Sequence, residues 1–480
     1  MAVWRLLPAM MSTAALLALL CLATIASAAT TPPDAAAFTI QDVVRTFDLV
    51  KPYARMAASI VAEVTSPTPQ SVFVLAFPTE LYDALALLDV RLKNVDMPLG
   101  QQLTYAPIMD PAGVPDVTFI EVQLDKEVPQ GEVLNLQLKT AFVHTYRPVP
   151  KEIRQAEQQS IIWEDSRFIL SPYTVTKQRT KIKFPDRGVA AYSRRGDDPL
   201  VDGTVVTYGP YNSTNPLTID PIKVRYEFNF PLLTASGFER EIWVSHIGSN
   251  VATEEHYDLT NDASKLANTF SRLRWQASMM AKERTVALQS LGMHLRPGVR
   301  DVYFTDEIGN VSTSAFRDDA RDPQLEIRPR YPIFGGWNYT FTIGWNHDLA
   351  RYVRAVSDKE DTYIIKVPFL EGPDALVYDK ADVSVVLPEG ARVLNAYSTF
   401  AGATKEEFLL RSQLDTVGRT VVKFSASKMT DEHRRSSDIF VTYEYTRESE
   451  LRKPLVVAAA VAALFAGVMI LGRLDVNISK

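Results

Sequence analysis

Histidine and carboxylate side chains are the first candidates for chemistry, because they bind metals and move protons near neutral pH. His246 and His256, with Glu254 and Glu255 beside the second, come nearest to a ligand cluster. A zinc site needs a third ligand and supporting hydrogen bonds. We therefore interpret these histidines as ordinary surface or edge-strand residues and expect no metal site. The six histidines of the sequence are His144, His246, His256, His294, His347 and His433.

Adjacent acidic residues occur at Asp197-Asp198 and Asp318-Asp319, and Asp322 follows the second pair. Two carboxylates can cleave a glycosidic bond when a pocket holds them at a fixed separation. Neighbouring strand residues point to opposite faces, so we expect these doublets in solvated loops instead. The sequence also contains no GxSxG, Walker or post-strand GxGxxG motif. We expect neither catalytic residues nor a cofactor site.

Acceptor motifs for N-glycosylation are better supported than any catalytic pattern. Asn310 follows Ile308-Gly309 at a predicted turn, so it is the sequon most expected to be exposed and modified. Asn212 and Asn338 also head N-x-S/T sequons. Asn477 matches as well, but we expect it on the cytosolic side of a membrane, where it would stay unmodified.

Composition limits the classes of protein to consider. The chain has 480 residues, of which 46% are hydrophobic and 22% charged. These values are typical of globular proteins, and the length favours two or three domains. A net charge of -6 argues against a strongly basic nucleic-acid binder. Cys21 is the single cysteine of the sequence, so a disulfide scaffold is excluded.

Residues 1–28 are typical of a secretory signal peptide. Arg5 gives the positive start, Ala14 to Leu22 give a short apolar run, and Ala26-Ser27-Ala28 gives a small-residue cleavage site. Cleavage after Ala28 would also remove Cys21. We then expect a mature chain that enters an oxidising compartment without a thiol.

A second apolar run, from Leu455 to Leu471, predicts a transmembrane helix over residues 454–472. Basic residues flank it on both sides, so the signal peptide has to set the orientation. We expect a single-pass type I protein whose bulk is lumenal and whose residues 473–480 form a cytosolic tail. Ala459, Ala463 and Gly467 recur every four residues, which favours close packing against a partner helix.

Between these ends the sequence predicts a mainly β fold. Strand-like runs alternate apolar and polar residues and are separated by Pro and Gly, which is typical of antiparallel sandwiches. Helices are expected over Glu152–Ile162 and Ser264–Leu291, and a loop over Pro185–Pro210. A boundary near Ser236-Gly237 divides the chain into two β-rich lumenal domains, 29–236 and 237–453, with no internal repeat visible in the residues. The clearest strand predictions are Ser71–Phe77, Val117–Leu124, Val133–Thr145, Lys223–Phe230, Arg240–His246, Asp301–Thr305, Gln324–Arg328, Tyr339–Trp345, Asp361–Phe369, Asp382–Leu387, Thr420–Ser425 and Asp438–Thr446.

Three long blocks of sequence resemble the ribophorin I family. They are EREIWVSHIGSNVATEEHYDLTNDASK at Glu239–Lys265, DVYFTDEIGNVSTS at Asp301–Ser314 and LEIRPRYPIFGGWNYTFTIGWN at Leu325–Asn346. Shorter blocks add to the resemblance, which is clearest from about Thr207 onward. They are Thr207-Tyr208-Gly209-Pro210, Val386 to Ala391 and RLDVNISK at Arg473–Lys480.

The resemblance implies a non-catalytic subunit of the oligosaccharyltransferase complex in the endoplasmic reticulum (ER) membrane. That complex moves a preassembled oligosaccharide from dolichyl diphosphate to Asn in N-x-S/T of nascent chains. The implied partners are the other subunits, including the catalytic one, nascent polypeptide, the translocon and ER lipid, and no nucleic acid. Two alternative hypotheses are a type I adhesion or receptor glycoprotein at the cell surface, and a lumenal hydrolase that uses the His246/His256 region.

Overall fold

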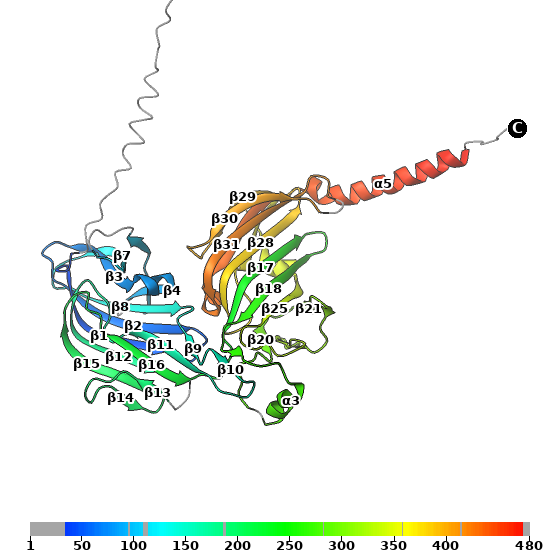
Figure 1. Ribbon diagram of the computed structural model, residues 1–480. Coiled ribbons are helices and arrows are strands. Elements are labelled where there is room, and N and C mark those ends of the chain that lie inside the picture. Colours follow the sequence, from blue (N-terminus) through cyan, green and yellow to red (C-terminus); the bar gives the residue numbers. More distant parts are fainter. Residues whose placement is uncertain are drawn as a thin grey trace, which may run out of the picture.

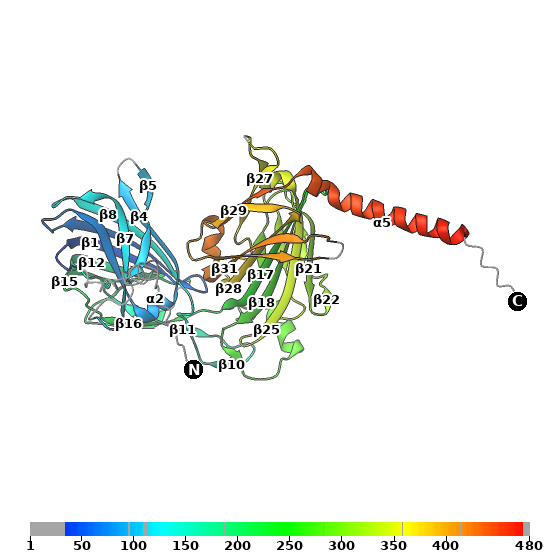
Figure 2. The same ribbon diagram turned by 90° about the horizontal axis from the view of Figure 1, so that it is seen from above.

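The computed structural model describes residues 34–94, 97–108, 114–185, 189–281, 283–357, 359–412 and 415–473. The predicted signal peptide, Cys21 and the sequon at Asn477 lie outside these residues. Figure 1 shows two β-rich halves side by side and one long helix leaving the second half. Seen from above, that helix points away from the first half (Figure 2).

Among its described residues, the first half contains three sheets and one short helix, α2 (Thr79–Asp83). The eight-stranded sheet has the order β14 (Leu200–Asp202), β15 (Val205–Thr214), β12 (Thr174–Lys183), β1 (Phe38–Asp48), β2 (Ala54–Val64), β8 (Val133–Phe142), β4 (Leu85–Asn94), β5 (Met97–Gln102). The four-stranded sheet is β13 (Val189–Tyr192), β16 (Pro221–Glu227), β11 (Ser160–Ser166), β9 (Arg147–Val149). The three-stranded sheet is β3 (Gln70–Pro78), β7 (Val117–Val128), β6 (Tyr105–Ile108).

The second half is built in the same way. Its eight-stranded sheet has the order β22 (Gly309–Asn310), β21 (Arg300–Asp306), β25 (Asn338–Asp348), β18 (Asn250–Asn261), β17 (Leu233–Ser245), β28 (Val377–Glu389), β31 (Arg419–Thr430), β30 (Thr404–Leu410). The four-stranded sheet is β26 (Val353–Ala355), β27 (Thr362–Pro368), β32 (Asp438–Glu444), β29 (Arg392–Ser398). The three-stranded sheet is β20 (Leu291–His294), β24 (Gln324–Ile327), β23 (Ala315–Arg317). The helices are α3 (Arg272–Met280), α4 (Leu349–Tyr352), a 3-10 helix (Asp431–Arg435) and α5 (Arg447–Arg473), and the short strands β10 (Glu152–Ile153) and β19 (Lys265–Leu266) pair across the halves.

The two halves share one topology. Counted along the chain, the strands of each eight-stranded sheet occupy the same spatial order. Each of these sheets also contains a parallel pair at the same place, β1 with β12 and β17 with β28. The smaller sheets agree as well, since β13-β16-β11-β9 corresponds to β29-β32-β27-β26 and β3-β7-β6 to β20-β24-β23. The fold is therefore duplicated, although the residues show no repeat.

The duplication extends to strand register. The pairing of β1 with β2 shifts between Ile40 and Asp42, and the pairing of β17 with β18 shifts between Ala235 and Gly237. Both shifts lie between the third and fifth residues of the strand. A bulge bends its strand and re-aims the side chains after it. The first strand of each half therefore bends at the same position relative to its neighbouring strand.

Alternating burial explains why these segments form strands. In β16, Ile222, Val224 and Tyr226 are buried while the residues between them are exposed. Removal of that apolar face from water is the main favourable term in packing one sheet on another. Each predicted strand coincides with an observed one, although β8 ends three residues before Thr145 and β16 three residues before Phe230; the mainly β class is confirmed. Buried side chains form two large clusters, one from residues 37–232 with Ala263 and Val286, the other from residues 233–445.

Several local predictions were wrong. Glu152–Ile162 is not a helix, because Ile161 and Trp163 are buried on the same face of strand β11, which pairs with β16. Of the described residues in Ser264–Leu291, only α3 is helical, since Lys265–Leu266 pair with β10. The predicted loop over Pro185–Pro210 contains β13, β14 and the start of β15. The sheets are also not purely antiparallel, as the pairs β1·β12 and β17·β28 show.

The boundary near Ser236-Gly237 stays a prediction. Both residues lie inside β17, at its register shift. The topological repeat begins at Leu233, the first residue of β17. Residues 228–232, between β16 and β17, are thus an alternative place for the division of the chain.

Candidate functional site

An ionic cluster joins the two halves. The turn between β1 and β2 carries Lys51, whose Nζ lies 2.8 Å from Asp431 Oδ2 and 2.9 Å from Glu432 Oε1 on the 3-10 helix. Tyr53 donates its hydroxyl hydrogen to Asp431, and Arg55 Nη1 lies 2.9 Å from Glu432 Oε1. Burial opposes ionisation of Asp431, but the bonds from Lys51 and Tyr53 outweigh it and lower the pKa of this carboxyl. The cluster therefore keeps its charges and fixes one half on the other.

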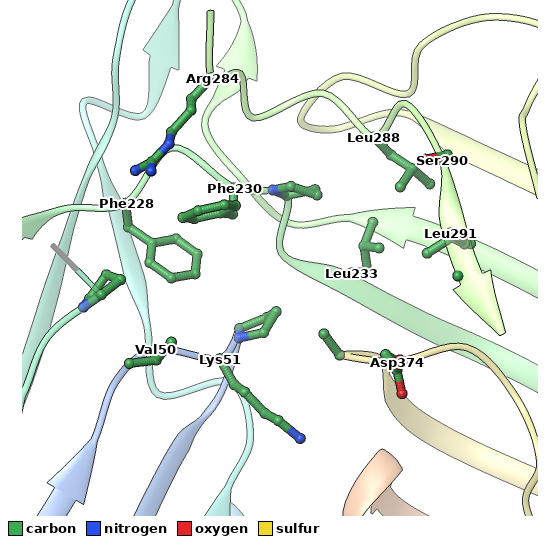
Figure 3. A pocket seen from close by; sticks show the side chains of 15 residues that line it. Val50, Lys51, Phe228, Phe230, Leu233, Arg284, Leu288, Ser290, Leu291 and Asp374 are labelled. Carbon is green, nitrogen blue, oxygen red and sulfur yellow. The ribbon is translucent and has the colours of Figure 1, made fainter. Parts of the chain in front are cut away.

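A cavity of about 420 Å³ opens beside this cluster. That volume lies within the range of small-ligand and side-chain pockets. Figure 3 shows Phe228 and Phe230 on one wall and Leu233, Leu288 and Leu291 on the other. The lining draws on both halves: Val50, Lys51, Pro52, Pro185, Phe228, Phe230, Pro231, Leu233, Arg284, Leu288, Ser290, Leu291, Gly292, Asp374 and Ala375.

The charged groups of the lining are already engaged by other residues of the chain. Lys51 is held by the ionic cluster, and Asp374 Oδ1 lies 2.6 Å from Arg434 Nη2. The Arg284 guanidinium lies over the Phe230 ring, 5.5 Å from its centroid. Phe228 and Phe230 meet edge to face with centroids 5.3 Å apart. The surface left for a ligand is therefore mainly apolar and aromatic.

The candidate histidines are not brought together. His256 pairs with Glu239 along the hairpin of β17 and β18, whereas His246 lies beyond the end of β17. His246 Nε2 is 2.7 Å from the Tyr443 hydroxyl, and burial lowers the pKa of its imidazole. His256 Nδ1 instead lies 3.0 Å from Thr342 Oγ1. Within the described parts of the chain, no group of three or more His, Cys, Asp and Glu is arranged to hold a metal ion.

The acidic doublets are likewise apart from the pocket. Asp197, Asp318 and Asp319 are exposed, as predicted. Asp198 is half-buried instead, because it accepts hydrogen bonds from the Gly209 N–H at 3.0 Å and from the Tyr211 hydroxyl. Asp322 Oδ1 lies 2.9 Å from His294 Nδ1. These carboxylates serve local structure.

Each half also buries an arginine against a carboxylate inside its core. Arg45 is 5% exposed, and its Nη1 lies 3.7 Å from Asp165 Oδ1. Arg240 is 2% exposed and donates to Glu371, with Glu255 Oε1 3.6 Å from its Nε. Burial raises the pKa of Glu255 to about 7, against the opposing attraction of Arg240. Because these groups are enclosed by packed side chains, they act on stability rather than on a ligand.

The three sequons that were predicted to be lumenal all present an exposed asparagine. Asn310 lies in β22, Asn212 in β15 and Asn338 at the start of β25. A glycan needs an asparagine side chain open to solvent. Modification at these positions stays a prediction.

The apolar helix α5 begins in contact with the second half. Lys453 Nζ lies 2.6 Å from Asp415 Oδ1, and Ser449 Oγ contacts the Gly390 carbonyl at 3.4 Å. Gly390 has a φ of +81°, which other residues rarely adopt, and a Cβ there would meet Ser449 Oγ at 2.8 Å, so the position favours glycine. The helix is long and apolar enough to cross a membrane, and none of its residues is buried. Ala459, Ala463 and Gly467 share one face of it, so the packing prediction remains open to test.

The interpretation of the sequence missed the pocket. Alternation along the predicted strand Lys223–Phe230 does place Phe228 and Phe230 on the face of Tyr226. It gives no sign that Phe230 would be 39% exposed. The signal that could have raised the question is Pro231, which follows the predicted strand and two aromatic residues near the predicted domain boundary.

Comparison with known proteins gives a consistent result over most of the chain. The family model described as Ribophorin I matches residues 38–472. Dolichyl-diphosphooligosaccharide–protein glycosyltransferase subunit 1B of Oryza sativa subsp. japonica is 33% identical over 447 residues, which cover 90% of this chain and 90% of the relative. Subunit 1A of Arabidopsis thaliana is 31% identical over 444 residues, covering 92% of this chain and 71% of the relative. Subunit 1 of Caenorhabditis elegans is 29% identical over 440 residues, which cover 92% of this chain and 73% of the relative.

Proposed function

The chain belongs to the ribophorin I family, and from that premise we propose that it is a non-catalytic subunit of the oligosaccharyltransferase complex in the ER membrane. In this role it acts as a scaffold and presents nascent polypeptide, while another subunit transfers the oligosaccharide from dolichyl diphosphate to Asn in N-x-S/T. The observation that carries the proposal is the extent of the family match, residues 38–472, which includes both halves and nearly all of α5.

The non-catalytic part of the proposal is supported by where the candidate groups lie. His246 packs among tyrosines, with the Tyr363 ring centroid 4.7 Å away and the Tyr445 centroid 4.8 Å away. Lys51 and Asp374 in the pocket are bound to other residues of the chain. General acid–base catalysis needs a titratable group within hydrogen-bond reach of the substrate. The geometry favours binding over bond cleavage.

Two features support membership of a membrane complex. Helix α5, the one candidate membrane span among the described residues, suits a single-pass type I topology in which both halves are lumenal. Its row of small residues offers a face for a neighbouring helix. The proposed partners are the catalytic and other subunits, nascent polypeptide, the translocon and ER lipid.

Purification from membranes in mild detergent tests the proposal. We expect the tagged full-length chain to bring down a multi-spanning glycosyltransferase subunit from ER membranes. The purified single chain should not turn over a lipid-linked oligosaccharide, and depletion should lower glycosylation of acceptor proteins unevenly. Recovery from the cell surface with an extracellular ligand, and without a glycosyltransferase, would instead support an adhesion or receptor protein.

A further inference from the structure

The pocket between the halves has the character of a side-chain acceptor. We propose that it binds an extended segment of the acceptor polypeptide through large apolar side chains of that segment. The inference rests on the proposed function, since it names where a presented polypeptide would be held. The cavity of about 420 Å³ is large enough for ligand groups of this kind.

The charged side chains of the lining are bound to other residues of the chain, which disfavours a polar ligand. A sugar or nucleotide site needs a few polar groups aimed at the ligand. Here the Lys51 ammonium is turned to Asp431 and Glu432, and the Asp374 carboxylate to Arg434. A ligand would therefore be recognised by shape and apolar contact.

The apolar walls are stiff and open to solvent at one aromatic ring. Pro52, Pro185 and Pro231 restrict the backbone around the cavity. Phe228 is 1% exposed and anchors the wall in the core, whereas Phe230 is 39% exposed. Arginine over an aromatic face attracts it electrostatically, so Arg284 holds the Phe230 ring in place. A preformed apolar wall lowers the entropic cost of binding a flexible chain.

Backbone pairing is a poorer explanation than side-chain binding. Strand β20 is an edge of its sheet and contributes Leu291 and Gly292 to the lining. The Gly292 carbonyl already accepts the Asp374 N–H at 3.2 Å, so this part of the edge is occupied. A Cβ built on Gly292 meets no atom within 4 Å, which leaves room for an incoming side chain.

The position of the pocket favours polypeptide over membrane lipid. Asp374 and Ala375 precede β28, and Glu389 at the other end of β28 lies near Lys453 of α5. A strand rises about 3.3 Å per residue, so these ends are separated by roughly 40 Å. Figure 1 shows α5 leaving the second half at that far end. A lipid seated in the bilayer around α5 would not reach the pocket, whereas a chain in the lumen would.

Site-specific photocrosslinking of the full-length chain in its complex tests the inference. A photoreactive residue at Ser290, exposed in the lining, is compared with one at Glu406, exposed on β30. The probe is a translocating acceptor polypeptide with a Leu/Phe-rich segment, and its control carries serines there. We expect an adduct at Ser290 that is at least about fivefold stronger with the apolar probe, the size expected for loss of one anchoring side chain.

Variants that fill the cavity form the second part of the crosslinking experiment. Gly292→Phe should fill the cavity and reduce the Ser290 adduct about fivefold or more, while Gln289→Phe, just outside the lining, should not. Phe230→Ser removes an exposed ring and should also reduce the adduct, which covers the case in which Gly292→Phe does not accumulate. Equal adducts at Ser290 and Glu406, or adducts that withstand both pocket variants, would overturn the inference. So would a lipid or a second copy of the chain as the main adduct.

The same membranes separate the inference from the proposed function. Recovery of the catalytic subunit with the wild-type chain, but no adduct at Ser290, would refute polypeptide binding in the pocket and leave the proposed function standing. Failure to recover that subunit would count against the proposed function, whatever the adducts.

Discussion

Arg45 and Arg240 are equivalent residues of the two halves. Each is the eighth residue of the strand that opens its half, and each is buried against a carboxylate from the four-stranded sheet or the segment that follows it. The partner is Asp165 in β11 for Arg45, and Glu371, just after the corresponding strand β27, for Arg240. A buried pair of this kind contributes little net stability but is costly to break. The duplicated pair therefore ties the two sheets of each half together in one arrangement.

Removal of one arginine should destabilise its own half. Arg240→Ala leaves the buried Glu255 without its cation and Glu371 with only the partly exposed Arg296, so we expect a loss of about 3 kcal/mol in the free energy of unfolding. Hydrogen exchange should show the loss in the second half and leave the first half protected. Arg225→Ala, at an exposed position of β16, is the matched control and should change stability by less than about 0.5 kcal/mol. Equal losses from both variants would contradict the assignment.

Glu255 should make stability depend on pH. Burial raises the pKa of its carboxyl to about 7, above its ordinary value of 4.5. Between these values the folded chain keeps a proton that the unfolded chain has released, so stability falls as pH rises through this window. Glu255→Gln should remove a contribution on the order of 3 kcal/mol across it. Denaturant unfolding at several pH values, compared between the two chains, measures this slope; parallel slopes would refute the prediction.

The stabilisation from the contact of His144 with Asp379 should also fall as pH rises, but by a smaller amount. His144 Nε2 lies 2.6 Å from Asp379 Oδ1 across the halves, and this hydrogen bond raises the pKa of the imidazole. Its stabilisation is fully present below the ordinary histidine pKa and is lost as pH rises through the raised value. Both side chains are about half exposed, so solvent screening keeps the effect below about 1 kcal/mol.

Hydrogen exchange at the interface measures that effect. The amides of Ala141 and Val143, buried where the halves meet, should lose protection as pH rises. His144→Asn should remove the pH dependence beyond intrinsic exchange, whereas His256→Asn, on β18, should keep it. Identical profiles for the two variants would show that His144 has no such role.

Glycosylation should follow exposure and topology. We expect glycan at Asn310, Asn212 and Asn338, whose side chains are exposed, and none at Asn477. Mass spectrometry of the protein from ER membranes, with Asn→Gln variants as controls, checks each position. Glycan on Asn477 would reverse the proposed orientation of α5.

The small-residue face of α5 should contribute to binding of the other subunits. Ala463→Leu with Gly467→Leu keeps the helix apolar but holds a partner backbone away, so recovery of the other subunits should fall. Val461→Leu with Val468→Leu adds bulk to the opposite face and should leave recovery unchanged. Undiminished pull-down of the first variant would support a passive anchor, with the lumenal halves carrying all of the binding.

Patterns within single segments were predictable, whereas relations between segments were not. Alternation predicted β16 and β32, and the apolar run predicted α5, because each depends on neighbours in the chain. The helix predicted over Ser264–Leu291 failed because Lys265 and Leu266 pair with β10, more than 100 residues away. The duplication was hidden because equivalent positions such as Val43 and Phe238 keep burial but not residue type, and an isolated match such as Arg45 with Arg240 gives no visible repeat. The pocket was hidden for a related reason, since its lining comes from several distant segments.

The contacts of Ser449 and Lys453 at the start of α5 fix the rotational position of this helix relative to the second half. Ser449 and Lys453 hold the helix to the second half, and the helix continues from there through Ala459 and Gly467. Each residue turns an α-helix by about 100°, so the direction of the small-residue face is set by the count of residues after Lys453. One inserted alanine would swing that face a quarter turn away from its partner, and seven would bring it nearly back. A neighbouring helix that binds the small-residue face would therefore also determine which side of the two halves meets the rest of a complex.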